Sequence, residues 1–361
     1  MLAKIETYLH LTLLAVGLAA IVDTRWVAAA EPDFSGRTLV VQTWGGALAE
    51  AEKAAFYAPF ENETGAKIKL VESTGESAAQ LKVQVTSGNV EWDLITGWDE
   101  ATMLRFANED LLERIDFEKV PGVKELTPGT YFEYGVADEI DAVVAAYSTA
   151  GGAKPLASFK DFFDVKGFPG PRAAPNWGTA AINCMVALLA DGVSRDKLFP
   201  LDVDRCLKVW DRVAPSIEVW YQSGSQMQQA MVDNTVAYCF CWDGRVQQAR
   251  KANPNWTYVY EGGETHNSFI GIVKGTKNLD MALAFLQFTT DPRRQAVFVE
   301  KIGYSAPNPK AADYLPEALK PYLSTAPENR AKLLVLTPEE NEIVAKETAE
   351  IENRWTAWIS K

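Results

Sequence analysis

The sequence predicts an α/β protein of two lobes, with mainly parallel sheets and helices packed against them. Short apolar runs, which are typical of buried strands, alternate along the chain with helical patterns, as expected for β–α units. The chain has 361 residues, of which 47% are apolar. The alternation therefore covers more chain than one sheet normally holds, and there is enough apolar sequence for two cores.

The individual elements follow from their residue patterns. Apolar runs predict strands at 38–42, 67–72, 92–95, 142–147, 217–221, 236–241, 258–260 and 269–273. Helical patterns run from 47 to beyond 57 and cover 77–87, 158–164, a segment ending near 189, 202–213, 225–232, 246–250, 279–289, 292–301 and 338–359. Two Gly-rich segments, 167–171 and 261–268, are expected to be loops.

Three tryptophans stand at the ends of expected strands. Trp44, Trp98 and Trp242 each follow such a strand closely. In open α/β sheets, ligands bind at the carboxyl edge of the strands, where the strand ends converge. Any one of these indoles could belong to the core, but three at equivalent positions predict a ligand cleft with aromatic walls.

Residues next to these tryptophans add polar chemistry. Trp242 is followed by Asp243, Gly244 and Arg245, so an indole, a carboxylate and a guanidinium stand within four residues at an expected turn. The alternative is a buried tryptophan beside a solvated Asp–Arg turn. Two expected helix starts are further candidate binding sites, because the free backbone N–H groups at a helix start bind anions. They are found at Gly45-Gly46 and at Asn176-Trp177.

The charge and the composition limit the choice of partners. The formal net charge is -13 and the pI is about 4.8, so a nucleic-acid partner is not expected. The acidic excess is spread along the chain, which favours a role in solubility. Eleven tryptophans are a high number, and indoles at a surface usually serve recognition.

The amino terminus has the pattern of an export signal. Lys4 precedes an apolar run over 9–22, and Ala28 to Ala30 form a small-x-small cleavage site before Glu31. The expected signal peptide is therefore 1–30, cleaved near Ala30, and the expected location is the periplasm. The alternative is an uncleaved anchor, although the run is short for a spanning helix.

The four cysteines are compatible with disulfides in an exported protein. Cys239 and Cys241 are two apart on an expected strand, so their side chains share one face, and a bond between them is expected to be strained. We therefore expect buried thiols, or one bridge from this pair to Cys184 or Cys206.

Several segments in order resemble one known family. They are Val40-Val-Gln-Thr-Trp44, Trp92-Asp-Leu94, Ser158-Phe-Lys-Asp-Phe-Phe163, Cys241-Trp-Asp-Gly-Arg245, Glu261-Gly-Gly263 and Ile302-Gly-Tyr-Ser-Ala-Pro-Asn308. In this order and spacing the chain resembles the periplasmic substrate-binding proteins of the spermidine/putrescine type. The resemblance implies two α/β lobes with mixed sheets, a ligand cleft at the hinge, and delivery of the ligand to a membrane permease powered by an ATPase.

The resemblance also implies how the chain is divided. It crosses between the lobes near Ala137–Asp141, near His266 and near Ala312. Lobe 1 is then 37–138 plus 266–312, and lobe 2 is 139–265 plus 313–361. A monomer is expected.

The family's aromatic ligand contacts fall on Trp44, Trp242 and Tyr304 by position, and Trp98 falls in a loop that supplies another. The acidic contacts that hold polyamines do not carry over. The acidic positions read Gly46 and Ser268, or lie near Asn176 and Trp177, while Gly45 and His266 stand at the neighbouring Thr and Trp positions of the family. Arg245 replaces a small polar residue. Each charge change removes a negative charge or adds a positive one, which argues against a polyamine.

These observations leave three candidate functions. The first is an ABC-importer binding protein for a small carboxylate-bearing or zwitterionic ligand, with Arg245 on the carboxylate, the Gly45 and Gly46 amides as further donors, and Asp99 or Asp243 on an amine. The second keeps putrescine or spermidine, with Asp99, Asp243, Glu139 or Asp141 as replacement acids. The third is an exported sugar-acting enzyme, for which no hydrolase or phosphate-loop motif is present. The expectation is a binding protein that has no catalytic residues, metal or cofactor.

Overall fold

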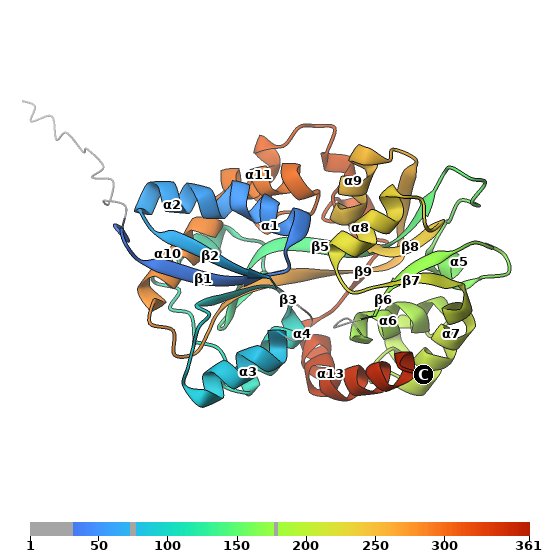
Figure 1. The fold of residues 1–361 in the computed structure, drawn as a ribbon, viewed down its shortest axis with the longest axis horizontal. Helices are drawn as coiled ribbons and strands as arrows, with labels where there is room; N and C mark the ends of the chain where they lie inside the picture. Colours follow the sequence, from blue (N-terminus) through green and yellow to red (C-terminus); the bar gives the residue numbers. More distant parts are fainter. Residues whose placement is uncertain (1–31, 73–76, 177–179) are drawn as a thin grey trace, which may run out of the picture. The chain divides into compact units, whose positions relative to one another are not determined.

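The computed structural model describes residues 32–72, 77–176 and 180–361 (Figure 1). The expected signal peptide with its cleavage near Ala30, and the candidate contact Trp177, lie outside the described residues. Within the described ranges, no helix combines the length and the apolar character needed to cross a membrane.

Ten strands of the described chain form one mixed sheet. In spatial order they run β2-β1-β3-β9-β5-β8-β6-β7, with β10 paired to β9 and β4 to β5. Their bounds are β1 Thr38–Thr43, β2 Lys67–Glu72, β3 Leu94–Asp99, β4 Tyr131–Phe132, β5 Gly135–Ser148, β6 Arg172–Pro175, β7 Ile217–Tyr221, β8 Tyr238–Trp242, β9 Trp256–Ile272 and β10 Leu334–Val335. The outer trios β2-β1-β3 and β8-β6-β7 are parallel, whereas β5 and β9 run antiparallel to each other and to their outer neighbours.

Helices cover both faces of this sheet. They are α1 Gly46–Glu52, α2 Ala58–Thr64, α3 Ser77–Ser87, α4 Glu100–Asn108, α5 Phe159–Phe163, α6 Ala180–Ala190, α7 Val203–Val213, α8 Gly224–Val232, α9 Asp243–Ala252, α10 Leu279–Thr289, α11 Pro292–Ile302, α12 Pro327–Arg330 and α13 Pro338–Ile359. A π-helical turn, η1 Lys53–Tyr57, joins α1 to α2, and short 3-10 turns occur at Pro121–Glu125, Arg195–Lys197, Ala214–Ser216, Pro309–Tyr314 and Lys320–Tyr322. In the view of Figure 1, α1, α2, α9 and α11 lie above the sheet, and α3, α4, α6, α7 and α13 lie below it. The predicted bounds of α3, α10 and α13 are confirmed.

The long strands β5 and β9 connect the two halves of the sheet. At one end β9 pairs with β3, and at the other end β5 pairs with β8. The predicted loop 261–268 is wrong, because this segment is extended within β9. Its backbone groups pair with β5 from Glu139↔Ser268 to Val143↔Glu264, and this pairing outweighs the local preference of Gly262 and its neighbours for a loop.

The predicted turn after Trp242 is also wrong. Trp242 ends β8, and α9 begins directly at Asp243. A glycine is needed at Gly244 because the ring of Tyr304 lies against its backbone, where a Cβ would be 2.5 Å from the Tyr304 ring. The helix start therefore holds Asp243 and Arg245 in fixed directions, which a loose turn would not.

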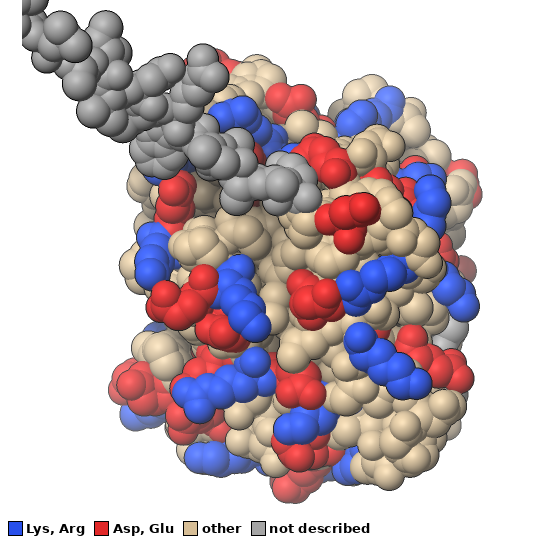
Figure 2. All heavy atoms as spheres, turned by 90° about the vertical axis from the view of Figure 1, so that its left-hand side faces the viewer, with Lys and Arg blue, Asp and Glu red and all other residues tan. Residues whose placement is uncertain are grey.

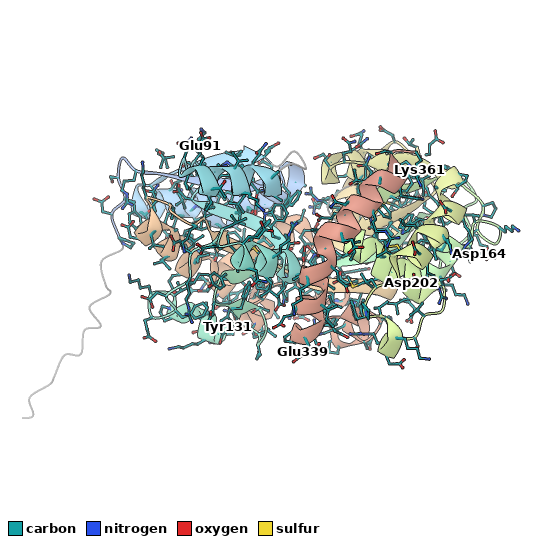
Figure 3. The ribbon with its side chains drawn as sticks, turned by 90° about the horizontal axis from the view of Figure 1, so that it is seen from below. Glu91, Tyr131, Asp164, Asp202, Glu339 and Lys361 are labelled. Atoms are coloured by element: carbon teal, nitrogen blue, oxygen red, sulfur yellow. A yellow bond between two sulfur atoms is a disulfide. The ribbon has the colours of Figure 1, made fainter. Side chains whose placement is uncertain are left out.

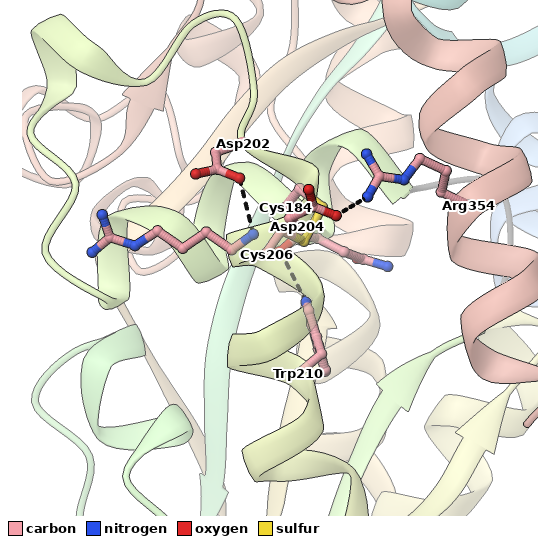
Figure 4. The surroundings of a disulfide bond; sticks show 8 residues. Cys184, Asp202, Asp204, Cys206, Trp210 and Arg354 are labelled. Atoms are coloured by element: carbon pink, nitrogen blue, oxygen red, sulfur yellow. Dashed lines mark hydrogen bonds and ion pairs between the residues drawn. A yellow bond between two sulfur atoms is a disulfide. The ribbon is translucent and has the colours of Figure 1, made fainter.

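Two disulfides replace the pairing expected from sequence. Cys184 on α6 is bonded to Cys206 on α7 (Figure 4). Close to this bond, Asp204 of α7 forms an ion pair with Arg354 of α13. Cys239 is bonded to Cys241 within β8. The expectation of free thiols, or of a bridge between the two pairs, is wrong. Cys239 and Cys241 do point to one face of β8, but their Cα atoms are only 5.5 Å apart, within the usual range for a bridge.

The carboxyl-terminal helix packs across both halves of the fold. Seen from below in Figure 3, α13 runs diagonally from near Glu339 to Lys361. It contacts α4 in one half and α6 and α7 in the other. Its Trp355 is buried against Trp210, with ring centroids 5.3 Å apart. The side chain of Asn341 donates to Glu100 of α4 over 2.9 Å.

The surface charges are interspersed on the face shown in Figure 2. Lys and Arg side chains lie among Asp and Glu side chains there, with uncharged residues between them. This pattern agrees with the interpretation that the acidic excess serves solubility.

Candidate functional site

A cavity lies where β5 and β9 pass between the two halves of the sheet. It encloses about 850 Å³, including its open mouth. Its lining combines indoles, carboxylates and one guanidinium, contributed by both halves: Trp44, Leu48, Gly97, Trp98, Asp99, Glu139, Asp141, Ile182, Gln222, Ser223, Gly224, Trp242, Arg245, His266, Ser268 and Tyr304.

Two cross-strand pairs form the floor of this cavity. Glu139 of β5 stands opposite Ser268 of β9, and Asp141 stands opposite His266. Residues two apart on a strand point to the same face, so all four side chains line the cavity together. The floor is therefore a compact polar patch on one face of the two central strands.

His266 bridges two carboxylates. Its Nε2 lies 2.9 Å from Oδ1 of Asp141, and its Nδ1 lies 2.8 Å from Oε2 of Glu264. Burial opposes the charged imidazolium, but the carboxylates of Asp141 and Glu264 outweigh it and raise the pKa of His266 well above its ordinary value. The Ser268 hydroxyl donates to Oδ2 of Asp141 over 3.2 Å, so Asp141 has partners on both oxygens.

Two indoles are fixed at the side of the cavity by their own hydrogen bonds. Trp44 donates through Nε1 to the carbonyl of Gly97, and Trp98 donates through Nε1 to Oε1 of Gln42, over 2.9 and 2.8 Å. Their ring centroids are 4.9 Å apart. Gly97 has a φ of 73°, and a Cβ there would overlap the Trp44 ring. With the N–H groups used internally, the aromatic faces are left as the surface offered to a ligand.

Arg245 is the cation of the site. Its side chain is only 4% exposed, and Nη1 is buried without a hydrogen-bond partner among the described residues. No ion pair to it is formed within the described ranges. It lies beside the amino end of α8, where Ser223 and Gly224 also line the cavity. Because a helix start carries partial positive charge, the two together form a site for an anionic group.

Gly224 offers a test of this geometry. A Cβ on Gly224 would lie 2.7 Å from Cζ of Arg245, so the guanidinium packs directly against the glycine backbone. We expect Gly224→Ala to displace the guanidinium and weaken binding of a carboxylate ligand about tenfold, while unfolding stability stays equal or rises by up to about 1 kcal/mol, since alanine favours helix. Calorimetric titration and urea unfolding measure the two effects. Unchanged affinity would contradict this placement of Arg245.

Asp243 does not line the cavity, contrary to the expectation that it holds an amine. It is fully buried and accepts hydrogen bonds from the backbone N–H groups of Ala142 and Gly244 and from the hydroxyl of Tyr260, over 3.2, 2.8 and 3.1 Å. Burial and the charge of Asp141 raise its pKa to about 8, although these donors oppose the shift. Asp243 therefore joins α9 to the sheet behind the site.

The glycines and the asparagine expected at the site are also outside its lining. A Cβ on Gly45 would overlap the carboxyl group of Glu72. A Cβ on Gly46 would overlap the Ser225 hydroxyl and lie 3.5 Å from Nη1 of Arg245. Asn176 is half-buried, and its N–H donates to the carbonyl of Tyr221. Side chains of other elements therefore fill the space beside the two glycines, and the backbone of β7 takes the N–H of Asn176, which local sequence does not reveal.

The other sequence candidates do line the cavity. They are Trp44, Trp98, Asp99, Trp242, Arg245, His266, Ser268 and Tyr304. Asp99 also caps α4, accepting from the N–H and the hydroxyl of Thr102 over 3.0 and 2.8 Å. The main omission was the segment Gln222 to Gly224. It stands between a strand and a helix that were both predicted, so the strand-end rule applied to the tryptophans would have found it.

No metal centre is suggested by the described residues. Among them, no group of three or more His, Cys, Asp or Glu side chains is arranged to hold a metal ion. The acids of the cavity are instead arranged around His266 and against the sheet.

Comparison with known proteins places this geometry in a family. A family model for bacterial extracellular solute-binding proteins matches residues 55–330. The γ-aminobutyric acid-binding protein of Pseudomonas aeruginosa is 30% identical over 338 residues, covering 92% of this chain and 94% of that protein.

Two solved structures are similar over nearly their whole length. One is AgtB of A. tumefaciens R10 in complex with agropinic acid, with a TM-score of 0.80, 27% identity, and coverage of 90% of this chain and 99% of that chain. The other is an ABC transporter substrate-binding protein of Bradyrhizobium japonicum, with a TM-score of 0.79, 32% identity and the same coverage. The two-domain α/β fold with its mixed sheet is thereby confirmed. The chain belongs to the bacterial extracellular solute-binding protein family.

Proposed function

We propose that the protein is the periplasmic binding component of an ABC importer, and that its ligand is a small molecule with a carboxylate, in particular a zwitterion of the amino-acid type. The observation that carries this proposal is the combination, in one cavity, of the unpaired Arg245 guanidinium with indole walls and a carboxylate floor. The names of the similar proteins, which bind γ-aminobutyrate and agropinic acid, support the same ligand class.

The binding mode follows from the lining. Arg245 and the amino end of α8 receive the carboxylate, and Trp44, Trp98 and Trp242 cover the carbon chain. The floor of Glu139, Asp141, His266 and Ser268 faces the other end of the ligand. Because unpaired buried charge is costly, the Arg245 side chain favours a ligand that brings a compensating anion.

The lobes proposed from the family resemblance, 37–138 with 266–312 and 139–265 with 313–361, close over the ligand by a hinge motion. Support for this boundary comes from β5 and β9, which pass between the halves of the sheet at the cavity floor. The closed lobes then present the ligand to a permease–ATPase complex. Export with cleavage near Ala30, and the monomeric state, are parts of this proposal.

The alternative ligand is a polyamine such as putrescine or spermidine, which the carboxylates Glu139, Asp141 and Asp99 favour. A thermal-shift panel separates the two. We expect γ-aminobutyrate and related zwitterions to raise the melting temperature, because a ligand at 100 times its Kd stabilises the folded state by about 2.7 kcal/mol. Putrescine, spermidine and glucose are expected to leave it unchanged. A rise with the polyamines alone would select the polyamine alternative.

A further inference from the structure

We propose that Glu139 is the ammonium-binding residue of the cleft, and that it releases a proton to solvent when a zwitterionic ligand enters. This inference rests on the proposed function and identifies the group that recognises the cationic end of the ligand. Sequence considerations had favoured Asp99 or Asp243 for that end.

Glu139 is the lining acid that has neither a hydrogen bond nor an ion pair to another described residue. Its side chain is 3% exposed, and its Oε2 is buried without a hydrogen-bond partner among the described residues. Of the other lining acids, Asp141 is held by His266 and Ser268, and Asp99 is held by Thr102. An incoming ammonium group therefore finds an available acceptor at Glu139, next to the floor residues that surround it.

The charges around Glu139 explain why this acceptor is protonated when the cleft is empty. The charged groups that act on it are mostly acidic: Glu52 at the end of α1, and Asp138 and Asp141 from β5, with Arg245 from α9 as the opposing cation. Tyr304 after α11 also interacts with it, and Asp99 of β3 and His266 of β9 line the same cavity. Burial, followed by the charges of Asp138, Asp141 and Glu52, raises the pKa of Glu139 well above its ordinary value, and Arg245 opposes this only in part.

Binding then exchanges one positive charge for another. In the empty cleft Glu139 is a neutral carboxylic acid. When the ammonium group arrives, the O–H bond of the acid breaks, its proton leaves to a buffer base, and the carboxylate accepts a hydrogen bond from the ammonium group, which keeps all its protons. The ligand's own carboxylate pairs with Arg245, so the filled site holds two neutral ion pairs, and its net charge is lower by the one proton released.

The exchange gives a rule for specificity and for pH dependence. A zwitterion satisfies both Arg245 and Glu139, whereas a plain carboxylate of the same length leaves Glu139 protonated and releases nothing. Affinity for the zwitterion therefore rises with pH up to the raised pKa of Glu139 and then levels off, because below that pKa the proton must be removed first. Affinity for the plain carboxylate does not follow this rise.

The test is calorimetric titration with γ-aminobutyrate and with butyrate, which lacks only the amine. Each titration is run at one neutral pH in two buffers of different ionisation enthalpy, neither of which binds, so that the difference in heat counts the protons released. We expect up to one proton per γ-aminobutyrate and none per butyrate. In Glu139→Gln the release disappears and γ-aminobutyrate binds about tenfold more weakly or worse, while butyrate is affected about twofold or less.

The matched control is Asp138→Asn. Asp138 is the neighbouring acid, is equally buried, also has an unpartnered oxygen, and does not line the cavity. Because Asp138 does not line the cavity, this variant should keep the preference for γ-aminobutyrate over butyrate. The loss of the Asp138 charge lowers the pKa of Glu139, so the proton release at neutral pH should shrink, while affinity for γ-aminobutyrate does not fall as it does in Glu139→Gln. If γ-aminobutyrate binds the wild type without proton release, and Glu139→Gln binds it equally well, the role of Glu139 is overturned and the proposed function stands. If neither γ-aminobutyrate nor butyrate binds and putrescine does, the proposed function fails, and this inference fails with it.

Discussion

Replacing Arg245 with alanine is expected to weaken binding of γ-aminobutyrate by about 2–5 kcal/mol, the usual cost of removing one partner of a buried charge pair. The ligand carboxylate would lose its buried counter-charge and face Glu139 and Asp141. Calorimetric titration measures the loss. Arg245→Lys should recover only part of it, because an ammonium group cannot form the two parallel hydrogen bonds of a guanidinium.

The control for this variant is Arg250→Ala. Arg250 lies on the same helix, α9, but outside the cavity lining, with its guanidinium over the ring of Tyr322. Its loss should leave affinity within about a factor of two, since it changes only long-range charge that salt screens. If Arg245→Ala and Arg250→Ala weaken binding equally, a general charge effect explains the result and Arg245 holds no specific group. If Arg245→Ala improves the binding of putrescine, the polyamine alternative is favoured.

The largest expected loss of folding stability is for Trp210→Ala, at about 3–5 kcal/mol, which is typical of truncating a buried aromatic residue. Trp210 is fully buried, packs against Phe163 and Trp355 with ring centroids 5.2 and 5.3 Å away, and donates to the carbonyl of Asn183. Its removal opens a cavity where α7 meets α13. Urea unfolding measures the change, and Trp210→Phe, which keeps most of the volume, should lose less.

Trp44→Ala is the matched contrast, because it removes the same side chain from the cavity wall. Trp44 is half-buried, so its truncation should cost clearly less folding stability than that of Trp210, while γ-aminobutyrate affinity falls by about 1–3 kcal/mol. The two variants thus separate core from recognition surface. Equal destabilisation by both, with ligand affinity unchanged in Trp44→Ala, would show that Trp44 serves packing alone.

The spacing of polar residues in the sequence is enough to indicate part of the cavity floor. Glu139 and Asp141 are two apart directly before the apolar run 142–147, and His266 and Ser268 repeat this spacing. Charged residues at period two in a buried strand share one face and need a reason to be there. The assignment of 261–268 as a loop hid the second pair, because glycine-rich sequence is a local signal and strand pairing is not.

The sequence alone determined the α/β alternation, the tryptophans at the strand ends, and the loss of the family's acids together with the gain of Arg245, since each of these features can be recognised from a few consecutive residues. Only the tertiary structure decided which acid is available to a ligand. Ser268 reaches Asp141 across 127 positions of sequence, and His266 occupies the other oxygen of that carboxylate. Asp243 accepts hydrogen bonds from Tyr260 and from the backbone of β5, so its carboxylate is not available to a ligand. These outcomes depend on the register of β9 against β5, which is set by long-range backbone pairing and by burial, so no local pattern could single out Glu139.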